Sequence, residues 1–188
     1  METERKYLIS SMEEALKVLD SGPFFYIKDI EQEDKYYACR EFNIRLRREN
    51  GELKFTIKSK KDGDTRMEIE DFEEVVSFLR EKGYVEIENP DREEVDVALE
   101  KRFGILGYVS KRGRKYSYAT PWGDVYIEVA EVEFRKGRKR RVKTVMEIEY
   151  AGSSGDGVKA VENAERFLRK FLRMRKVRWS NKGYLEKM

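Results

Sequence analysis

Charged and apolar residues alternate one by one through several segments, and this alternation constrains the fold more than any other feature of the chain. In residues 42–50, Arg45 and Arg47 alternate with Ile44 and Leu46. Because successive side chains of a β-strand point to opposite faces, the segment predicts a strand with one charged and one apolar face. The same pattern recurs at 52–60, 64–70, 123–130 and 141–150.

These segments belong to a longer series of strand and helix signals. Apolar runs between turn residues predict about eight strands, at 1–9, 24–38, 42–50, 52–60, 64–70, 107–119, 123–134 and 141–150. Amphipathic periodicity predicts four helices, at 10–22, 71–83, 91–104 and 158–177. Ser10 or Ser11 is expected to cap the first helix and Asp71 the second. Short connections favour antiparallel pairing, and the absence of a linker favours one domain over 1–188.

Histidine is absent from the chain, and cysteine occurs once, as Cys39. Without an imidazole, Ser-His-Asp catalysis, Cys-His catalysis and histidine metal sites are all excluded. A single cysteine also excludes an intrachain disulfide and favours a reducing compartment. Any bound metal is therefore expected to have oxygen ligands, which suit Mg, Mn or Ca.

Charged residues make up 41% of the chain, yet the formal net charge is only +3. This mixture, with Gln32 as the only glutamine, is typical of proteins from thermophiles. No apolar run is long enough to span a membrane, and the acidic N-terminus does not resemble a signal peptide. We therefore expect a cytoplasmic protein with no membrane partner.

Two arrangements explain the charged strand faces. One is an antiparallel sheet whose charged side faces solvent. The other is a closed sheet whose charged side faces inward while amphipathic helices cover the outside. The repeated Glu-x-Glu pairs favour the second, because like charges in close register destabilise a solvated sheet. An eight-stranded barrel can hold one small ligand, and charges inside it must be paired or bound. The closed sheet therefore predicts a polyanion bound by the bases and cations bound by the acids.

Short motifs occur along the chain in a recognisable order. They are ETERK (2–6), QEDKYY (32–37), RLR (45–47), KFTIK (54–58), RMEIE (66–70), RGR (112–114), IEV (127–129) and EIE (147–149). In this order they resemble the CYTH superfamily, the triphosphate tunnel metalloenzymes, over about residues 1–150. That superfamily includes class IV adenylyl cyclases, thiamine triphosphatases and inorganic triphosphatases. The resemblance implies an α+β fold, an eight-stranded antiparallel β-barrel tunnel with a charged interior and helices around it.

The resemblance also implies roles for particular residues. The bases expected to bind triphosphate are Lys6, Arg45, Arg47, Lys54, Lys58, Arg66, Arg112 and Arg114. The acids expected to hold Mg or Mn are Glu2, Glu4, Glu147 and Glu149. The catalytic residues are expected to be Lys6, Glu68, Glu70 and Glu128. Two alternatives stay open: Glu131 replaces Glu128 if its strand is bulged, and Lys111 replaces Arg112 if its strand is shifted by one residue.

The expected function is a divalent-metal-dependent triphosphatase acting on inorganic, nucleoside or thiamine triphosphate. A class IV adenylyl cyclase is the first alternative, and a non-catalytic binder of polyphosphate or RNA 5′ ends is the second. The basic run at 135–143 is interpreted as a hairpin turn, so nucleic acid is not an expected obligate partner. The glycine-rich run at 152–159 lacks the lysine of a phosphate-binding loop and is interpreted as a turn before a helix. A homodimer is left open.

Overall fold

The computed structural model describes residues 3–59 and 67–188. The chain divides into two compact units. Unit 1 comprises Met1–Glu31, Lys111–Glu133 and Arg141–Trp179. Unit 2 comprises Gln32–Ser110, Phe134–Arg140 and Ser180–Met188. Each unit is described by itself below, and the prediction of one domain over the whole chain stays a prediction.

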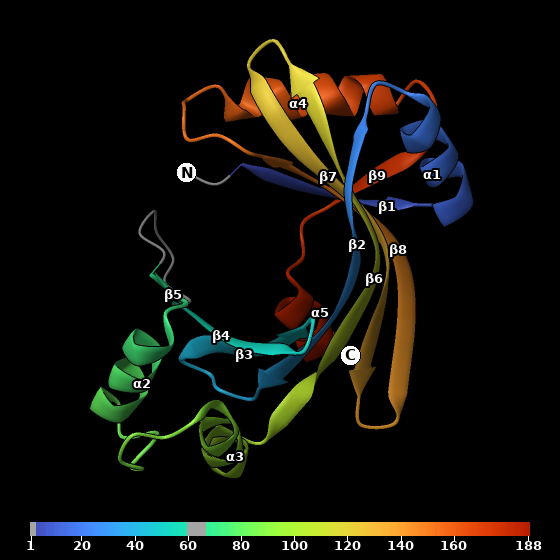
Figure 1. The fold of residues 1–188 in the computed structure, drawn as a ribbon. Coiled ribbons are helices and arrows are strands. Elements are labelled where there is room, and N and C mark those ends of the chain that lie inside the picture. Colours follow the sequence, from blue (N-terminus) through green and yellow to red (C-terminus); the bar gives the residue numbers. More distant parts are fainter. Residues whose placement is uncertain (1–2, 60–66) are drawn as a thin grey trace. The chain divides into compact units, whose positions relative to one another are not determined.

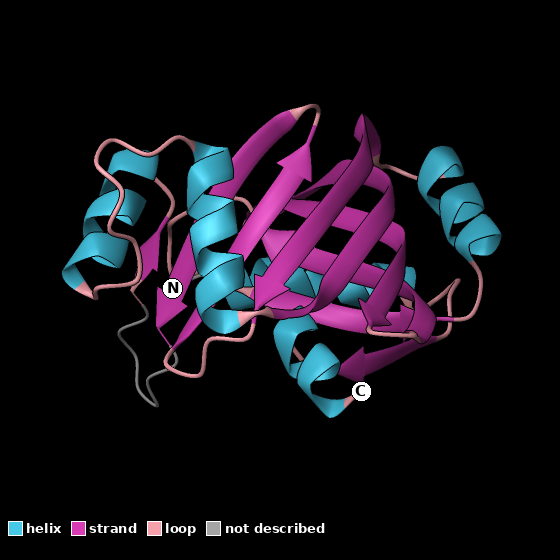
Figure 2. Cartoon of the chain, turned by 90° about the horizontal axis from the view of Figure 1, so that it is seen from below, coloured by secondary structure: helices cyan, strands magenta, loops and turns pink. Residues whose placement is uncertain are grey.

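Strands run through both units (Figures 1 and 2). They are β1 (Glu4–Ile9), β2 (Phe25–Tyr37), β3 (Phe42–Glu49), β4 (Glu52–Ser59), β5 (Glu68–Ile69), β6 (Ile105–Thr120), β7 (Gly123–Lys136), β8 (Lys139–Tyr150) and β9 (Met174–Val177). Neighbours are hydrogen-bonded in the order β5-β4-β3-β2-β6-β7-β8-β1-β9. The order has two ends, so no pairing among the described residues closes the sheet. The α+β class with antiparallel strands is confirmed, with nine strands described where about eight were predicted.

In unit 1 the apolar faces of the strands lie under helices α1 (Met12–Ser21) and α4 (Gly157–Leu168). Tyr7 of β1 and Ile148 of β8 share a buried core with Leu19 of α1 and Ala164 of α4. Ser11 caps α1 by accepting a hydrogen bond from the backbone N–H of Glu14 at 3.2 Å, so the second of the two predicted caps is used.

In unit 2 the apolar faces of β3 and β4 lie under α2 (Phe72–Glu81) and α3 (Arg92–Phe103). Ile44 and Ile57 are fully buried and share a core with Leu79 and Leu99. Asp71 caps α2 as predicted, and Asp91 caps α3 with a capping box. A fifth helix, α5 (Asn181–Lys187), was not predicted. In both units the alternation therefore predicted which strand face is covered by helices.

The C-terminal end of α4 differs from the prediction. The sequence pattern extended this helix to Val177, but it ends at Leu168. The Arg169 side chain donates a hydrogen bond to the backbone carbonyl of Met174 at 2.7 Å, which folds the chain back. Residues Met174–Val177 then form β9, which pairs with β1.

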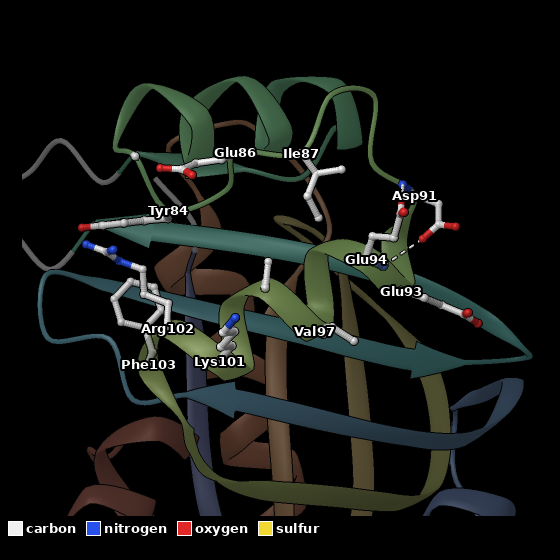
Figure 3. A pocket seen from close by; sticks show the side chains of 12 residues that line it. Tyr84, Glu86, Ile87, Asp91, Glu93, Glu94, Val97, Lys101, Arg102 and Phe103 are labelled. Carbon is white, nitrogen blue, oxygen red and sulfur yellow. Dashed lines mark hydrogen bonds between the residues drawn. The ribbon is translucent and has the colours of Figure 1, made fainter.

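A groove of about 970 Å³ runs along α3 in unit 2 (Figure 3). Tyr84, Ile87 and Val97 line it together with Phe103, so its floor is largely apolar. None of the residues predicted to bind triphosphate or metal lies in this groove. No helix among the described residues has the length and apolar character needed to cross a bilayer.

Candidate functional site

The pairing of β1 with β8 brings the predicted metal ligands together in unit 1. Glu4 lies opposite Glu149, and Lys6 lies opposite Glu147. Residues directly opposite in an antiparallel pair share a face, so all four side chains lie on the face away from α4. The Lys6 Nζ lies 3.9 Å from the Glu147 Oε1. Glu2, also predicted as a ligand, lies outside the described residues.

Two lysines of β6 complete this group. Lys111 is only 8% exposed, and its Nζ donates hydrogen bonds to Glu128 and, at 3.1 Å, to the Glu147 Oε1. The Lys115 Nζ lies 3.8 Å from the other Glu128 oxygen. We call this group the acidic cluster. Its members are Glu4, Glu128, Glu147, Glu149, Lys6, Lys111 and Lys115.

The acids of this cluster differ in their proton affinity. Burial, the hydrogen bond with Glu147 and the negative charge of Glu147 raise the pKa of Glu4 from 4.5 to about 8, against the opposing charge of Lys6. Because Glu4 is exposed at the surface, the neighbouring Glu147 carboxylate, more than burial, raises this pKa. Desolvation would raise the pKa of Glu147, but the charges of Lys111 and Lys6 outweigh it and lower that pKa. Glu4 therefore holds a proton more tightly than Glu147 does.

The bases of β6 lie on two different faces of the strand. Lys111, which was left open as an alternative, reaches the acids. The side chain of Arg112 is 80% exposed and pairs with Glu31, while Arg114 lies near Asp20 of α1. Arg112 and Arg114 therefore lie on the opposite face of β6 from Lys111.

The alternation of buried and exposed residues in β7 shifts next to this part of β6. Val129 and Ala130 are consecutive on β7 and both are fully buried, so the alternation shifts by one residue between them. A Cβ on Gly113 of β6 would lie 1.9 Å from the Val129 carbonyl oxygen, so only glycine allows this approach. Beyond the bulge Glu131 is exposed, and Glu128 contacts the lysines.

In unit 2 the basic faces of β3 and β4 surround one buried acid, Asp34 of β2, which is 1% exposed. Arg47 donates two hydrogen bonds to its carboxylate, from Nε at 2.8 Å and from a terminal nitrogen at 2.9 Å. Arg45 lies 3.7 Å from the same carboxylate and donates to the Thr56 hydroxyl at 3.1 Å. We call these four residues the arginine cluster. Asp34 was not predicted as a site residue, although it lies in the QEDKYY motif.

Pairing with Asp34 keeps Arg47 charged, and Arg45 has one buried donor in this cluster. Desolvation opposes ionisation of Arg47, but the hydrogen bonds and charge of Asp34 raise its pKa. Within residues 3–59 and 67–188, the buried Nε of Arg45 has no hydrogen-bond partner. A buried donor without an acceptor carries an energetic penalty, which an anion binding there would relieve. The arrangement suits phosphate oxygens, which arginine forks match well.

The remaining predicted residues of unit 2 form exposed ion pairs. The Lys54 Nζ lies 2.7 Å from Glu70, whose pKa is lowered mainly by this hydrogen bond. Lys58 lies 3.1 Å from Glu68. Side-chain exposures of 37–53% make both pairs weak contributors to stability. Arg66 lies outside the described residues.

A divalent cation is implied by the resemblance, and the acidic cluster fits one in donor chemistry. Glu4, Glu147 and Glu149 lie on one face of the β1–β8 pair, and Glu149 is the cross-strand partner of Glu4. Within 3–59 and 67–188, no group of three or more acidic or cysteine side chains is arranged so that it could hold a metal ion by itself. Mg²⁺ needs no such cage, because it commonly binds one or two carboxylates together with substrate phosphates.

The chain also matches a known protein family and several solved structures. The model of the CYTH domain matches residues 1–178. Similar solved structures include the PH1819 protein of Pyrococcus horikoshii OT3, with 26% identity, a TM-score of 0.60 and coverage of 100% of this chain and 99% of that one. The PH1012 protein of the same organism shows 20% identity, a TM-score of 0.55 and coverage of 92% and 94%. Among curated proteins, none is similar enough to this chain to count as a match.

Proposed function

The chain belongs to the CYTH family, because that domain matches residues 1–178, and on this premise we propose that it is a metal-dependent triphosphatase. Members of this family typically act on triphosphates. The proposed substrate is inorganic triphosphate or a nucleoside or thiamine triphosphate, and the proposed cofactor is Mg²⁺ or Mn²⁺. The proposed reaction is attack of water on the terminal phosphorus.

The observation that supports this proposal is the placement of Glu4, Glu147 and Glu149 on one face of the β1–β8 pair. A protein that only binds polyphosphate needs bases, and adjacent carboxylates weaken anion binding. Carboxylates kept side by side, with the pKa of one raised to about 8, instead favour a bound cation. The non-catalytic alternative is therefore less consistent with unit 1 than an enzyme.

Different residues would bind the metal and the phosphate oxygens. Glu4, Glu147 and Glu149 would hold the metal, which when bound supplies positive charge against the phosphate oxygens. Arg45 and Arg47 would bind phosphate oxygens, Arg47 being oriented by Asp34 and Arg45 by Thr56.

The lysines of unit 1 would act beside the metal. Lys6 and Lys111 would add positive charge, and Lys111 would be fixed by its two acidic partners. Phosphoryl transfer depends mainly on positioning and charge stabilisation, so these groups suffice without a protein nucleophile.

Product analysis tests the proposal. Tripolyphosphate, ATP and thiamine triphosphate would each be incubated with the protein and Mg²⁺ or Mn²⁺, and the products separated by ion exchange. We expect orthophosphate from tripolyphosphate, and loss of turnover when a chelator removes the metal. Cyclic AMP and pyrophosphate as the main products from ATP would establish the cyclase instead. Tight binding of tripolyphosphate without turnover under either metal would establish the non-catalytic binder.

A further inference from the structure

The segment after α4 returns to the charged face of unit 1. In the β1–β9 pairing, Ile9 lies opposite Met174 and Lys6 lies opposite Val177. Trp179 follows Val177 by two residues. The chain therefore carries an aromatic side chain past the end of β9, toward the part of β1 that bears Glu4 and Lys6.

The Trp179 ring contacts Lys6 directly. The Lys6 Nζ lies 5.1 Å from the ring centroid, within the range of a cation–π interaction. Its other partner, the Glu147 Oε1 at 3.9 Å, is too distant for a hydrogen bond. The Lys6 side chain is nevertheless only 14% exposed. Within the part of the chain that the structure describes, the ammonium group is thus held by the ring and by charge, and not by short hydrogen bonds.

This environment differs from that of the neighbouring Lys111. Lys111 donates hydrogen bonds to Glu128 and Glu147, which fix its position but occupy its N–H donors. An aromatic face attracts the charge of Lys6 without presenting an oxygen acceptor, so no described residue occupies the N–H donors of Lys6 with a short hydrogen bond. A long lysine side chain also loses rotamer freedom when it binds an anion, and prior positioning reduces that cost.

We propose that Trp179 is a positioning residue for Lys6, holding its ammonium group on the charged face of β1 ready to bind a phosphate oxygen. The inference rests on the proposed function, because it assigns Lys6 to the triphosphate. It adds a residue of the C-terminal segment to the substrate-binding apparatus. Trp179 itself does not touch the substrate in this proposal.

Substitution of Trp179 separates positioning from packing. Trp179→Phe keeps an aromatic face, whereas Trp179→Leu keeps only apolar bulk. A cation–π interaction contributes roughly 0.5–2 kcal/mol, so Trp179→Leu should lower kcat/KM about 2- to 30-fold. Trp179→Phe should retain most of the activity. Trp122→Leu, at the only other tryptophan, is the matched control and should be near wild type.

A double-mutant cycle shows whether Trp179 acts through Lys6. In a Lys6→Ala background, Trp179→Leu should cause no further loss, because the group it positions is gone. An equal loss in both backgrounds would overturn the proposal, as would Trp179→Phe being as damaging as Trp179→Leu.

A binding measurement tests the inference apart from turnover. Trp122→Phe leaves Trp179 as the only tryptophan, so emission reports on its ring alone. The probe is a hydrolysis-resistant imido analogue of tripolyphosphate with Mg²⁺, whose binding is followed in parallel by calorimetry. We expect binding to change the emission of this variant, and the added substitution Lys6→Met to remove most of that change. Calorimetric binding with unchanged emission would overturn the inference and leave the proposed function standing. No calorimetric binding of the analogue to the wild-type protein would overturn both.

Discussion

The acidic cluster of unit 1 and the arginine cluster of unit 2 are built alike but balance charge differently. Each lies on the charged face of strands whose apolar face is under helices. In unit 2 the one buried acid, Asp34, receives two hydrogen bonds from Arg47. In unit 1 the acids lie beside one another, and burial together with the neighbouring Glu147 raises the pKa of Glu4 to about 8.

This difference indicates what each cluster can gain from a ligand. The carboxylate of Asp34 is already matched, so a cation adds little in unit 2, whereas the buried Nε of Arg45 would gain from an anion. In unit 1 a cation would replace a proton and relieve the repulsion between Glu4 and Glu147. The two clusters therefore suit a metal and a polyanion respectively, and the following predictions test that contrast.

Removing one carboxylate of the acidic cluster should have the largest effect. Glu4→Gln resembles the protonated form that Glu4 has without metal, so the fold and melting temperature should be unchanged. Turnover of tripolyphosphate at saturating Mg²⁺ should fall by roughly a thousandfold or more, about 4 kcal/mol in activation free energy. Glu131→Gln, an exposed acid on β7, is the control and should keep full activity. Wild-type turnover of Glu4→Gln at limiting Mg²⁺ would remove Glu4 from the metal site.

Breaking the arginine cluster should instead affect stability. Arg47→Leu leaves Asp34 buried with only the more distant Arg45 beside it. Loss of one partner of a buried ion pair costs about 3–5 kcal/mol, and we expect roughly 3 in the free energy of unfolding by urea denaturation. The double variant Asp34→Asn with Arg47→Leu should recover at least half of this, because no buried charge remains. A change within about 0.5 kcal/mol in Arg47→Leu would show that Asp34 does not depend on this arginine.

Local sequence rules predicted much of both clusters. Period-two alternation placed Arg45 and Arg47 opposite Ile44 and Leu46, and burial of the two apolar residues agrees. Caps at Ser11 and Asp71 were predicted because a side-chain oxygen at a helix start satisfies a free backbone N–H. These features depend on residues a few positions apart, which a sequence displays directly.

The failures arose where distant segments decide the structure. Arg112 was preferred over Lys111 because the pattern was extended through a strand that meets the Val129–Ala130 bulge of its neighbour. The predicted end of helix α4 was Val177, because the helical periodicity of the sequence does not show that β9 pairs with β1. Asp34 was missed as a site residue because one acid in a mixed-charge strand looks like a surface residue until its two arginines are in place.

The next prediction concerns the close approach of Gly113 to the Val129–Ala130 bulge. Gly113→Ala places a methyl group against the backbone of Val129 and Ala130, which cannot move as a side chain would. Overpacking of this kind costs typically 1–3 kcal/mol, and we expect about 2 in the free energy of unfolding. Lys111, two residues away, should be displaced, so turnover should fall as well. Gly155→Ala, where an added Cβ meets nothing within 4 Å, is the control and should change neither quantity. Full stability in Gly113→Ala would show that β6 does not pass this close to the bulge.

The smallest effect is expected from a substitution on the helix-covered face of β1. Its effect on the free energy of unfolding should depend on pH, and turnover should not change. The Glu165 carboxylate of α4 accepts hydrogen bonds from Arg5 at 2.6 Å and Tyr7 at 2.7 Å, both on the face opposite Lys6. Desolvation would raise the pKa of Glu165, but the hydrogen bonds from Tyr7, Arg169 and Arg5 outweigh it and lower that pKa below 4.5. When the pKa of a carboxyl group is lower in the folded state, its ionised form stabilises the fold at pH values above the unfolded-state pKa. This stabilisation is lost as the pH falls through the folded-state pKa.

Glu165→Gln should therefore lower the free energy of unfolding by about 1 kcal/mol at pH 7, and the difference in this free energy from wild type should shrink as the pH falls below 4.5. Urea denaturation across this pH range measures that difference, and turnover at pH 7 should match wild type. A difference that grows toward acid pH, or a loss of turnover as large as that of Glu4→Gln, would show that the two faces of β1 are not separate in function.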